Sequence, residues 1–426
     1  MKTQFTRLRG MADQLPATVA PWQMLEQAVR NAMRAYGYGE MRTPLIERTT
    51  LFKRSIGEAT DIVEKEMYTF SDRNDESLTL RPENTAGCVR AAIENGLLQP
   101  GSVNRIWYTG PMFRYERPQL GRQRQFFQTG AEVYGLAGAA IEAELILLSA
   151  RLWRELGIID AVQLEINTLG DVDDRAAFRE KLVAFFTQHK EQLDEDSLRR
   201  LERNPLRILD SKNPAMQDLI AAAPALRDSL SDASLAHYEE LKVLLNASGI
   251  TVVENPRLVR GLDYYSHTVF EWTTDKLGSQ SAVCAGGRYD GLIEQLGAKN
   301  MPGVGWAFGM ERVVALMDAL QLTPPPSTPD VFVMATDDVS RAESLALAES
   351  IRELMPESSV LHNTSSGSLK SQFRKADKSG ATVAVIVGSE EMAAGTVTVK
   401  PLLNAGEQKA VPRSEVQEYL RGLLAD

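Results

Sequence analysis

The chain has 426 residues, more than one ordinary hydrophobic core holds, so its length predicts two or three domains. Hydrophobic residues make up 43% of it, a globular value that excludes extensive disorder. The formal net charge of −10 argues against a protein that coats nucleic acid indiscriminately, although it allows a local basic surface.

The N-terminal part of the sequence predicts a cytoplasmic location, and its first predicted element is a helix. Residues 1–16 lack the apolar run of a signal peptide, and no stretch approaches the ~20 apolar residues of a membrane helix, so we expect no membrane partner. From residue 22 to 36, apolar side chains recur at helical spacing, and Gly37 ends the predicted helix. A strand over residues 41–46 follows. Because Pro44 lacks a ladder donor, we expect this strand at an edge or an interface.

The middle of the chain alternates between strands and one long helical stretch. Residues 105–116 and 124–134 are predicted strands, joined by a polar loop whose charged and glycine residues suit mobility. A highly charged helical stretch runs from about residue 172 to 249. Residues 303–307 form a strand that leads into a helix. The other predicted strands cover residues 162–167, 251–253, 268–272 and 281–284.

The C-terminal part is set apart by the proline-rich stretch 323–329, the clearest linker in the chain. Strands and helices alternate beyond it, which is typical of a small α/β domain. The two cysteines, Cys88 and Cys284, and the four histidines form neither a disulfide framework nor a metal-ligand pattern. We therefore expect no protein-bound metal and a reducing compartment.

Polar side chains on the two strands beside the loop fall on one face of the predicted sheet. Arg114 and Glu116 are two residues apart on the first strand, and Phe126, Gln128 and Glu132 share parity on the second. An arginine fork suits a phosphate, and Phe126 suits stacking on a purine. A solvated face with cross-strand ion pairs is the alternative, and these residues alone favour it.

The letters FRYE at 113–116, followed by the loop and by RQF at 124–126, resemble motif 2 of the class II aminoacyl-tRNA synthetases. The resemblance implies that Arg114 holds the ATP α-phosphate and the amino-acid carboxylate. It implies that Glu116 reads the adenine amino group and that Phe126 stacks on the base. It also implies that the loop meets the acceptor end of tRNA through Arg117, Gln119 and Arg122.

Two other segments resemble the remaining class II motifs. GVGWAFGMER at 303–312 is similar to motif 3, a strand-to-helix step that ends in an ATP-binding arginine, here Arg312. Gly305 and Gly309 would allow close backbone approach there, and a glycine-softened helix start with a surface arginine is the alternative. The first helix and the Pro44 strand fit motif 1, the dimer interface of the class, which implies a homodimer.

The segments RGLDYY at 260–265 and AGGRYDG at 285–291 resemble histidine-specific signatures of the histidyl-tRNA synthetases, and LRPENTA at 80–86 resembles their substrate-binding strand end. A glycine turn is the alternative for the first two segments, and a plain strand-to-loop turn is the alternative for the third. The residues that would hold the histidine ammonium are Glu83, Thr85 and Gln128. The residues that would grip or wall the imidazole are Glu132, Tyr265 and Tyr264.

The resemblance also implies the charges at the ATP phosphates. Arg260 and Arg114 would stabilise the charge that builds on the α-phosphate, Arg312 would hold the outer phosphates, and Mg²⁺ on the nucleotide would offset the rest. Arg260 and Tyr265 are five residues apart, so they would reach one pocket together if the chain turned at Gly261.

The resemblance spans nearly the whole chain and implies an α+β core on a mostly antiparallel sheet of class II synthetase type, a helical insertion and a smaller α/β domain. We expect the core at 1–171 and 251–322, the insertion at 172–250, the linker at 323–329 and an anticodon-binding domain at 330–426. The implied activity is histidine–tRNA ligation: ATP and histidine form histidyl-adenylate with release of pyrophosphate, and histidine passes to the 3′ end of tRNA(His).

Further residues bear on the partners and on the alternatives. Lys370, Arg374 and Lys378 are spaced by four on a predicted helix and would contact anticodon-stem phosphates, with a solvated helix face as the alternative. Phe127 stands where this family leads us to expect histidine, and Leu120 where a small or basic residue is common. The main rival function is the idle paralogue that serves as a regulatory subunit of ATP phosphoribosyltransferase. A tRNA- or histidine-sensing domain is a weaker rival.

Overall fold

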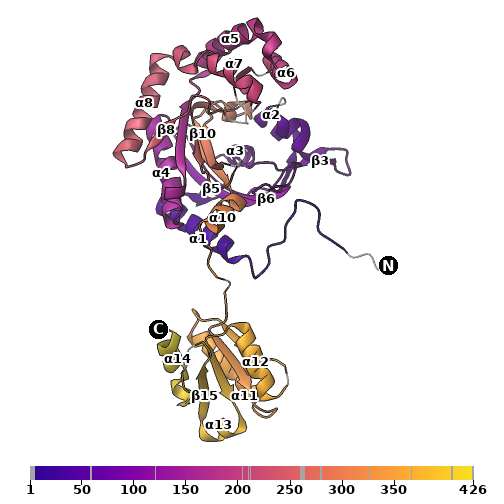
Figure 1. Ribbon diagram of the computed structural model, residues 1–426, viewed down its shortest axis with the longest axis vertical. Helices are drawn as coiled ribbons and strands as arrows, with labels where there is room; N and C mark the ends of the chain where they lie inside the picture. Colours follow the sequence, from indigo (N-terminus) through magenta and orange to yellow (C-terminus); the bar gives the residue numbers. More distant parts are fainter. Residues whose placement is uncertain are drawn as a thin grey trace. The chain divides into compact units, whose positions relative to one another are not determined.

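The computed structural model divides into two compact units, Met1–Pro324 and Pro325–Asp426, each with its own sheet (Figure 1). It describes residues 5–57, 60–119, 121–203, 205–209, 211, 213–259, 264–278, 281–325, 327–365, 367–403 and 406–424. The predicted fold class is confirmed, because a large mixed sheet with helices fills the first unit and a smaller sheet with helices fills the second. Within the described ranges, no helix is long and apolar enough to cross a membrane.

The larger unit is built on an eight-stranded sheet of order β1-β5-β6-β11-β10-β9-β7-β8. The two edge pairs, β1 with β5 and β7 with β8, are parallel, and the pairs between them are antiparallel. The strands are β1 (Gly39–Glu40), β5 (Asn104–Phe113), β6 (Gln125–Tyr134), β7 (Gln163–Thr168), β8 (Val252–Glu254), β9 (Ser266–Thr273), β10 (Ala282–Arg288) and β11 (Gly303–Gly309).

Period-two alternation gives this sheet two unlike faces. On β11 the large side chains of Val304, Trp306 and Phe308 pack into a core with the helices α1 (Ala20–Ala35), α4 (Ala139–Glu155) and α10 (Met310–Ala319). The residues between them, Gly303, Gly305 and Ala307, are small and belong to the opposite face. That face therefore has room for a cavity between the sheet and the elements that cover it.

The opposite face is covered by α3 (Thr85–Glu94) and by α5 (Val172–Gln188), α6 (Glu195–Arg203) and α7 (Gln217–Ala222), whereas α8 (Asp232–Ala247), from the same helical stretch, packs against α4 in the first core. No strand occurs among the described residues of 172–249. The carboxylate of Asp174 accepts the backbone N–H of Asp171 at 3.1 Å and that of Ser231 at 2.8 Å. One buried side chain thus holds the starts of α5 and α8 together.

A three-stranded sheet, β2 (Ile46–Arg48), β4 (Ser77–Leu80) and β3 (Tyr68–Ser71), lies beside α2 (Thr49–Ile56), and the hairpin of β3 and β4 stands out in Figure 1. The predicted strand over 41–46 is wrong, because β1 ends at Glu40 and β2 starts at Ile46. Between them Arg81 donates to the Thr43 carbonyl at 3.2 Å and to its hydroxyl at 2.9 Å. Pro44 adds no N–H, and this arginine joins the backbone bonds at the two ends of the segment, Met41 N–H to Trp107 O and Arg81 N–H to Leu45 O.

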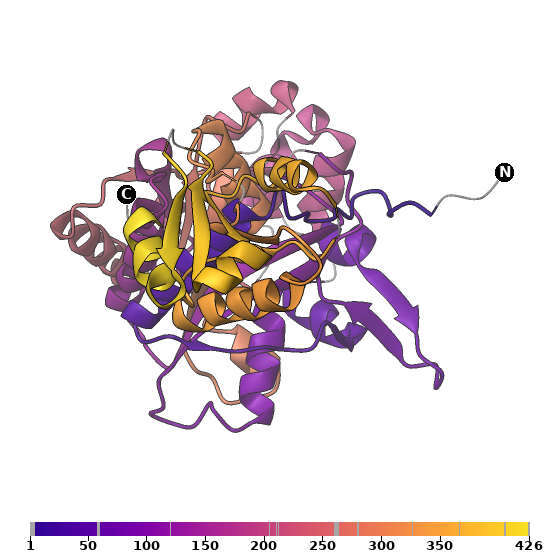
Figure 2. The same cartoon turned by 90° about the horizontal axis from the view of Figure 1, so that it is seen from below.

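The smaller unit carries a five-stranded sheet of order β13-β12-β14-β15-β16. Its elements are β12 (Val331–Ala335), α11 (Arg341–Leu354), β13 (Val360–His362), α12 (Leu369–Ser379), β14 (Val383–Val387), α13 (Ser389–Ala394), β15 (Thr396–Pro401), β16 (Lys409–Pro412) and α14 (Val416–Leu424). Helices α11 and α14 cover one face of this sheet and α12 covers the other (Figure 2), and the apolar residues on each face form a separate core cluster. The alternation predicted for this part is observed.

A buried ion pair anchors the end of β10. The Arg288 side chain is 2% exposed and donates to the fully buried carboxylate of Glu142 on α4. It also donates to Asp290 at 3.1 Å and to the carbonyl of Gly138 at 2.8 Å. This arginine therefore joins the sheet to α4 just before residues 289 and 290.

Arg288→Met should lower the free energy of unfolding of the larger unit by about 3 kcal/mol, because it removes the guanidinium from the buried Glu142, which keeps only its contact with His237 at 2.9 Å among the described ion pairs. All five tryptophans lie between residues 22 and 306, so tryptophan fluorescence during urea unfolding reports this unit alone. Adding Glu142→Leu to the variant should restore much of the loss. A change below about 0.5 kcal/mol, the size of ordinary surface substitutions, would show that the pair contributes little.

Candidate active site

A cavity of about 390 Å³ opens on the α3 side of the eight-stranded sheet. Its walls come from β5, β6, β9, β10 and β11, from the start of α3 and from the loop that follows β5. The structure brings these predicted site residues together in its lining: Glu83, Thr85, Arg114, Glu116, Arg122, Phe126, Gln128, Glu132, Tyr264, Tyr265 and Arg312. The candidate cation Arg260 and the proposed turn at 261–263 lie outside the described residues.

Glu132 on β6 lies at the floor of the cavity and is fully buried. Its carboxylate accepts the hydroxyl of Thr85 at 2.7 Å and the hydroxyl of Tyr289. Burial raises the pKa of Glu132 to about 8, although these two donors act in the opposite direction. Gly305 pairs with Glu132 across β6 and β11, and a Cβ there would collide with the carboxylate. The glycine of the GVGWAFG segment is therefore required at this position.

Glu83 is a second buried carboxylate, at the start of α3. It accepts the backbone N–H groups of Thr85 at 2.6 Å and Ala86 at 3.1 Å, so it caps the helix. Burial raises its pKa, and those backbone donors and Arg114 oppose the rise. Glu83 and Glu132 thus lie at one end of the cavity, and burial disfavours the ionised form of each. A cationic ligand there would favour their ionised forms.

Three tyrosines form the wall beside these carboxylates. The ring of Tyr264 lies 4.7 Å from that of Tyr265 and 5.5 Å from that of Tyr289. Arg175 of α5 donates to the Tyr265 carbonyl at 2.7 Å, which ties the helical segment to this wall. Tyr289 was missed as a site residue, although it lies in the AGGRYDG segment. The strand register shifts between Gly287 and Arg288, so parity along the strand does not predict its direction.

The AGGR part of that segment is strand β10, and the turn interpretation is wrong for it. A Cβ at Gly286 would lie 2.6 Å from the Cβ of Trp306, and one at Gly287 would lie 2.9 Å from the Tyr265 ring. Both glycines are needed for close packing. At Gly309 a Cβ would meet nothing within 4 Å, so the protein itself does not require a glycine there.

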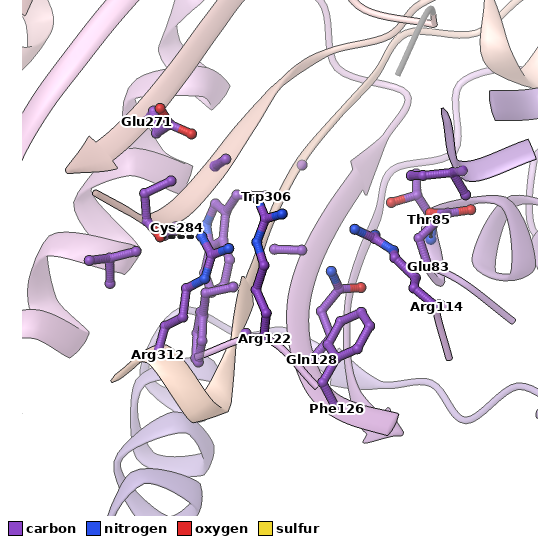
Figure 3. Close-up of a pocket in the computed structure, with 18 of the residues that line it drawn as sticks. Glu83, Thr85, Arg114, Arg122, Phe126, Gln128, Glu271, Cys284, Trp306 and Arg312 are labelled. Atoms are coloured by element: carbon purple, nitrogen blue, oxygen red, sulfur yellow. Dashed lines mark hydrogen bonds between the residues drawn. The ribbon is translucent and has the colours of Figure 1, made fainter. Parts of the chain in front are cut away.

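Arg122 and Arg312 mark the other end of the cavity, whereas Arg114 lies on the side of Glu83. Arg114 donates to the Pro82 carbonyl at 2.9 Å, and its guanidinium lies 5.2 Å from the Phe126 ring. The sequence pattern predicted that Arg114 and Glu116 lie on a strand and share one of its faces. They do not, because β5 ends at Phe113 and both residues follow it. Figure 3 shows Glu83, Thr85 and Arg114 on one side and Arg312 with Glu271 on the other, with Arg122 between them.

Arg122 and Arg312 approach each other in this region. Arg122 pairs with Glu116 at 3.3 Å, and Arg312 donates to the Ala282 carbonyl at 2.6 Å. Burial lowers the pKa of Arg312, and repulsion from Arg122 adds to the effect. An anionic ligand between the two guanidinium groups would relieve this repulsion.

Glu311 is another lining residue that the sequence interpretation missed. Its two carboxylate oxygens accept the backbone N–H of Phe127 at 2.9 and 3.1 Å, beyond the point where β11 ends. Burial raises the pKa of Glu311 to about 7. This carboxylate joins β6, which carries Phe126, to α10, which carries Arg312, so it sets the spacing between two walls of the cavity.

The remaining predicted residues lie away from the cavity floor. Arg117 and Gln119 are exposed on the loop after β5, whereas Leu120 lies outside the described residues. The Phe127 side chain packs edge-on against Trp22 of α1, with ring centroids 5.7 Å apart, so it faces the helix layer. His267 stacks on His237 at 5.3 Å. In the smaller unit Lys370, Arg374 and Lys378 are exposed on α12.

The raised pKa of Glu132 predicts that its carboxylate lowers the free energy of unfolding, and that the size of this effect depends on pH. Between the ordinary pKa of 4.5 and about 8 the folded chain holds a proton that the unfolded chain releases, so this group makes stability fall as pH rises through that window. The side chain of the Glu132→Gln variant does not ionise, so at pH 8 its free energy of unfolding in urea should exceed that of the parent by on the order of 4 kcal/mol.

The difference between Glu132→Gln and the parent should shrink towards pH 4.5. Thr129→Val on the same strand, a buried residue without charge, is a suitable control, and its effect should be the same at both pH values. A Glu132→Gln effect that does not change with pH would contradict the raised pKa.

Comparison with known proteins gives a family model for each of the two units. Residues 10–313 match the histidyl-tRNA synthetase family model, and residues 330–423 match the anticodon binding domain model. The apo histidyl-tRNA synthetase of S. aureus is 31% identical, with a TM-score of 0.82, over 98% of this chain and 100% of that one.

Two more distant structures share the fold. The histidyl-tRNA synthetase of Nostoc sp. is 20% identical, with a TM-score of 0.71, over 99% of this chain and 100% of that one. A Bacillus halodurans protein described as an ATP phosphoribosyltransferase regulatory subunit/histidyl-tRNA synthetase is 20% identical, with a TM-score of 0.64, over 91% of this chain and 100% of that one. With a cavity built from the predicted motifs and a family model that covers most of its length, the chain belongs to the histidyl-tRNA synthetase family.

Proposed function

We propose that the chain is a histidine–tRNA ligase, which activates histidine with ATP and transfers it to the 3′ end of tRNA(His). The observation that carries the proposal is one cavity with two unlike ends. Buried carboxylates and tyrosines lie at one end with Arg114 beside Glu83, and Arg122 and Arg312 lie at the other. A substrate with an ammonium and an imidazole suits the first end, and a nucleoside triphosphate suits the second.

In this proposal Glu83, Thr85 and Gln128 hold the histidine ammonium. The Gln128 carbonyl oxygen accepts the Tyr108 hydroxyl at 3.4 Å, which orients its amide. Glu132 and Tyr265 contact the two imidazole nitrogens, and Tyr264 closes the side of the pocket. Because these partners are buried, an amino acid that leaves them unpaired should bind much more weakly.

The first step is in-line attack of the histidine carboxylate on the α-phosphorus of ATP. A C–O–P bond forms, and the bond to pyrophosphate breaks. No protein base is needed, because the attacking carboxylate is already ionised at neutral pH. Arg114 and Arg260 offset the charge at the α-phosphate and Arg312 that at the outer phosphates, while Glu116 and Phe126 hold the adenine.

Mg²⁺ supplies further charge neutralisation when it is bound with the nucleotide. The described residues contain no group of three or more His, Cys, Asp or Glu side chains able to hold a metal alone. Glu271 lines the cavity, and its charge acts on Arg312, so it fits a metal that is bound mainly by phosphates and water.

In the second step a ribose hydroxyl at the tRNA 3′ end attacks the carbonyl carbon of histidyl-adenylate, and AMP leaves. Arg117, Gln119 and Arg122 on the loop after β5 are the proposed contacts with the acceptor end. The α12 stripe of Lys370, Arg374 and Lys378 is proposed to contact the anticodon stem, since the smaller unit matches an anticodon-binding model.

We further propose that the enzyme works in the cytoplasm as a homodimer. Support for the dimer comes from apolar side chains exposed around the three-stranded sheet. Leu45 is 41% exposed, Ile46 44% and Phe70 43%. A second copy that covers this sheet would remove these side chains from water.

ATP–pyrophosphate exchange with each amino acid in turn tests the activity. We expect exchange with histidine and none above background with the others. Arg260→Ala should lose most of the rate, by roughly 100-fold or more, while calorimetry still detects histidine binding. Lys190→Ala, on an exposed part of the helical segment, is the control and should keep the parental rate. A parent protein without histidine-dependent exchange would rule the proposal out.

The second candidate is a regulatory subunit of ATP phosphoribosyltransferase. It is favoured by the fold shared with the Bacillus halodurans protein, whose description names both roles. This candidate predicts no exchange, and stimulation of an added ATP phosphoribosyltransferase. The unit that matches the anticodon-binding model supports the ligase instead.

A further inference from the structure

The N-terminal residues 7–11, here called the N-terminal strap, contact the base of the loop after β5. The Gly10 carbonyl accepts the backbone N–H of Arg124 at 2.6 Å and that of Gln125 at 3.1 Å. The Leu8 carbonyl accepts the N–H of Met11 at 3.1 Å and closes a turn around Gly10. The strap is therefore attached to the point where the loop enters β6.

Gly10 fits this contact for two reasons. Its φ of +83° lies in the region that favours glycine. A Cβ at this position would lie 2.8 Å from the Cγ of Arg124 and 2.9 Å from the Cγ of Pro118. Pro118 and Arg124 lie on opposite sides of the loop tip. The backbone of the strap thus packs against both arms of the loop, and its neighbours in sequence are held beside them.

The strap carries positive charge that other side chains do not neutralise. Arg7 and Arg9 are exposed, as is Arg117 on the loop, and none of the three forms an ion pair with another described residue. Two other arginines of the loop are engaged: Arg122 pairs with Glu116, and the guanidinium of Arg124 lies 3.8 Å from the centroid of the Tyr115 ring. A chain of net charge −10 thus presents a local cationic surface at this loop.

We propose that Arg7 and Arg9 of the strap form part of the tRNA-binding surface and contact phosphates of the acceptor end beside the loop. Guanidinium groups bind phosphates through paired donors, and exposed arginines without carboxylate partners are available for such contacts. Phe5, beside them in sequence, is 98% exposed, and an aromatic side chain next to arginines is typical of surfaces that bind single-stranded nucleic acid. The inference rests on the proposed ligase function.

The double variant Arg7→Ala/Arg9→Ala separates the strap from the cavity. Histidine-dependent ATP–pyrophosphate exchange should stay at the parental level, because neither arginine lines the cavity. The KM for tRNA(His) in aminoacylation should rise about tenfold. In filter binding, the slope of log affinity against log salt should become shallower by about 1.5, the value for two lost phosphate contacts.

Arg151→Ala/Arg154→Ala is the matched control. It removes two exposed arginines from α4, on the other face of the sheet, and changes the net charge equally. Its KM and salt slope should match those of the parent. Arg7→Lys/Arg9→Lys, which keeps the charge, should regain most of the tRNA affinity.

Two results would overturn the inference: a strap variant with parental tRNA affinity and salt slope, or one whose pyrophosphate exchange falls as much as its aminoacylation. The second result would show that the strap supports the cavity instead of the RNA. Failure of the ligase function is distinguishable, because the parent would then show no histidine-dependent exchange, whereas tRNA binding is measured without catalysis.

Discussion

The burial of Glu132 opposite Gly305 is the contact on which the rest of the cavity depends. Strand alternation sends Trp306 and Phe308 into the helix-covered core and leaves glycine on the other face of β11. The carboxylate occupies the space that a Cβ at Gly305 would fill. Because this carboxylate is buried without an arginine, it raises the free energy of the empty protein when ionised. The polar floor is therefore stabilised by a ligand that donates hydrogen bonds to it.

The surrounding structure holds this unfavourable group in place. Thr85 and Tyr289 donate to it, and each is anchored by other contacts. The backbone of Thr85 is bound by Glu83 at the start of α3, and Tyr289 follows Arg288, whose guanidinium is fixed by Glu142. Destabilised carboxylates supported by a rigid frame are typical of functional sites, where local stability is lost in favour of binding.

Much of the fold follows from patterns in the sequence. Helical spacing predicted the first helix, and strand parity placed Phe126, Gln128 and Glu132 on one face, as observed. Strand alternation does not apply to Arg114 and Glu116, since β5 ends before them. The predicted strand around Pro44 is wrong because a distant arginine, Arg81, holds that segment. Such long-range side-chain contacts leave no periodic signal.

Two lining residues could not have been predicted from local sequence. Glu311 contacts the backbone of Phe127, which lies 184 residues away in the chain. From local sequence, a glutamate on a helix is expected to be an ordinary surface residue. Tyr289 reaches Glu132 through an irregularity in strand register. The roles of the predicted residues rest on the resemblance and the shared cavity, and Arg260 lies outside the described residues.

A calorimetric titration with two truncated analogues of histidine tests whether the buried carboxylates select a ligand by its donors. Histamine keeps the ammonium and imidazole but lacks the carboxylate, whereas imidazolepropionic acid keeps the carboxylate and lacks the ammonium. We expect measurable binding of histamine, and for imidazolepropionic acid a loss of roughly 100-fold or more relative to histidine, since Glu83 would then stay buried without an ammonium beside it. Binding of imidazolepropionic acid as tight as that of histidine would contradict it.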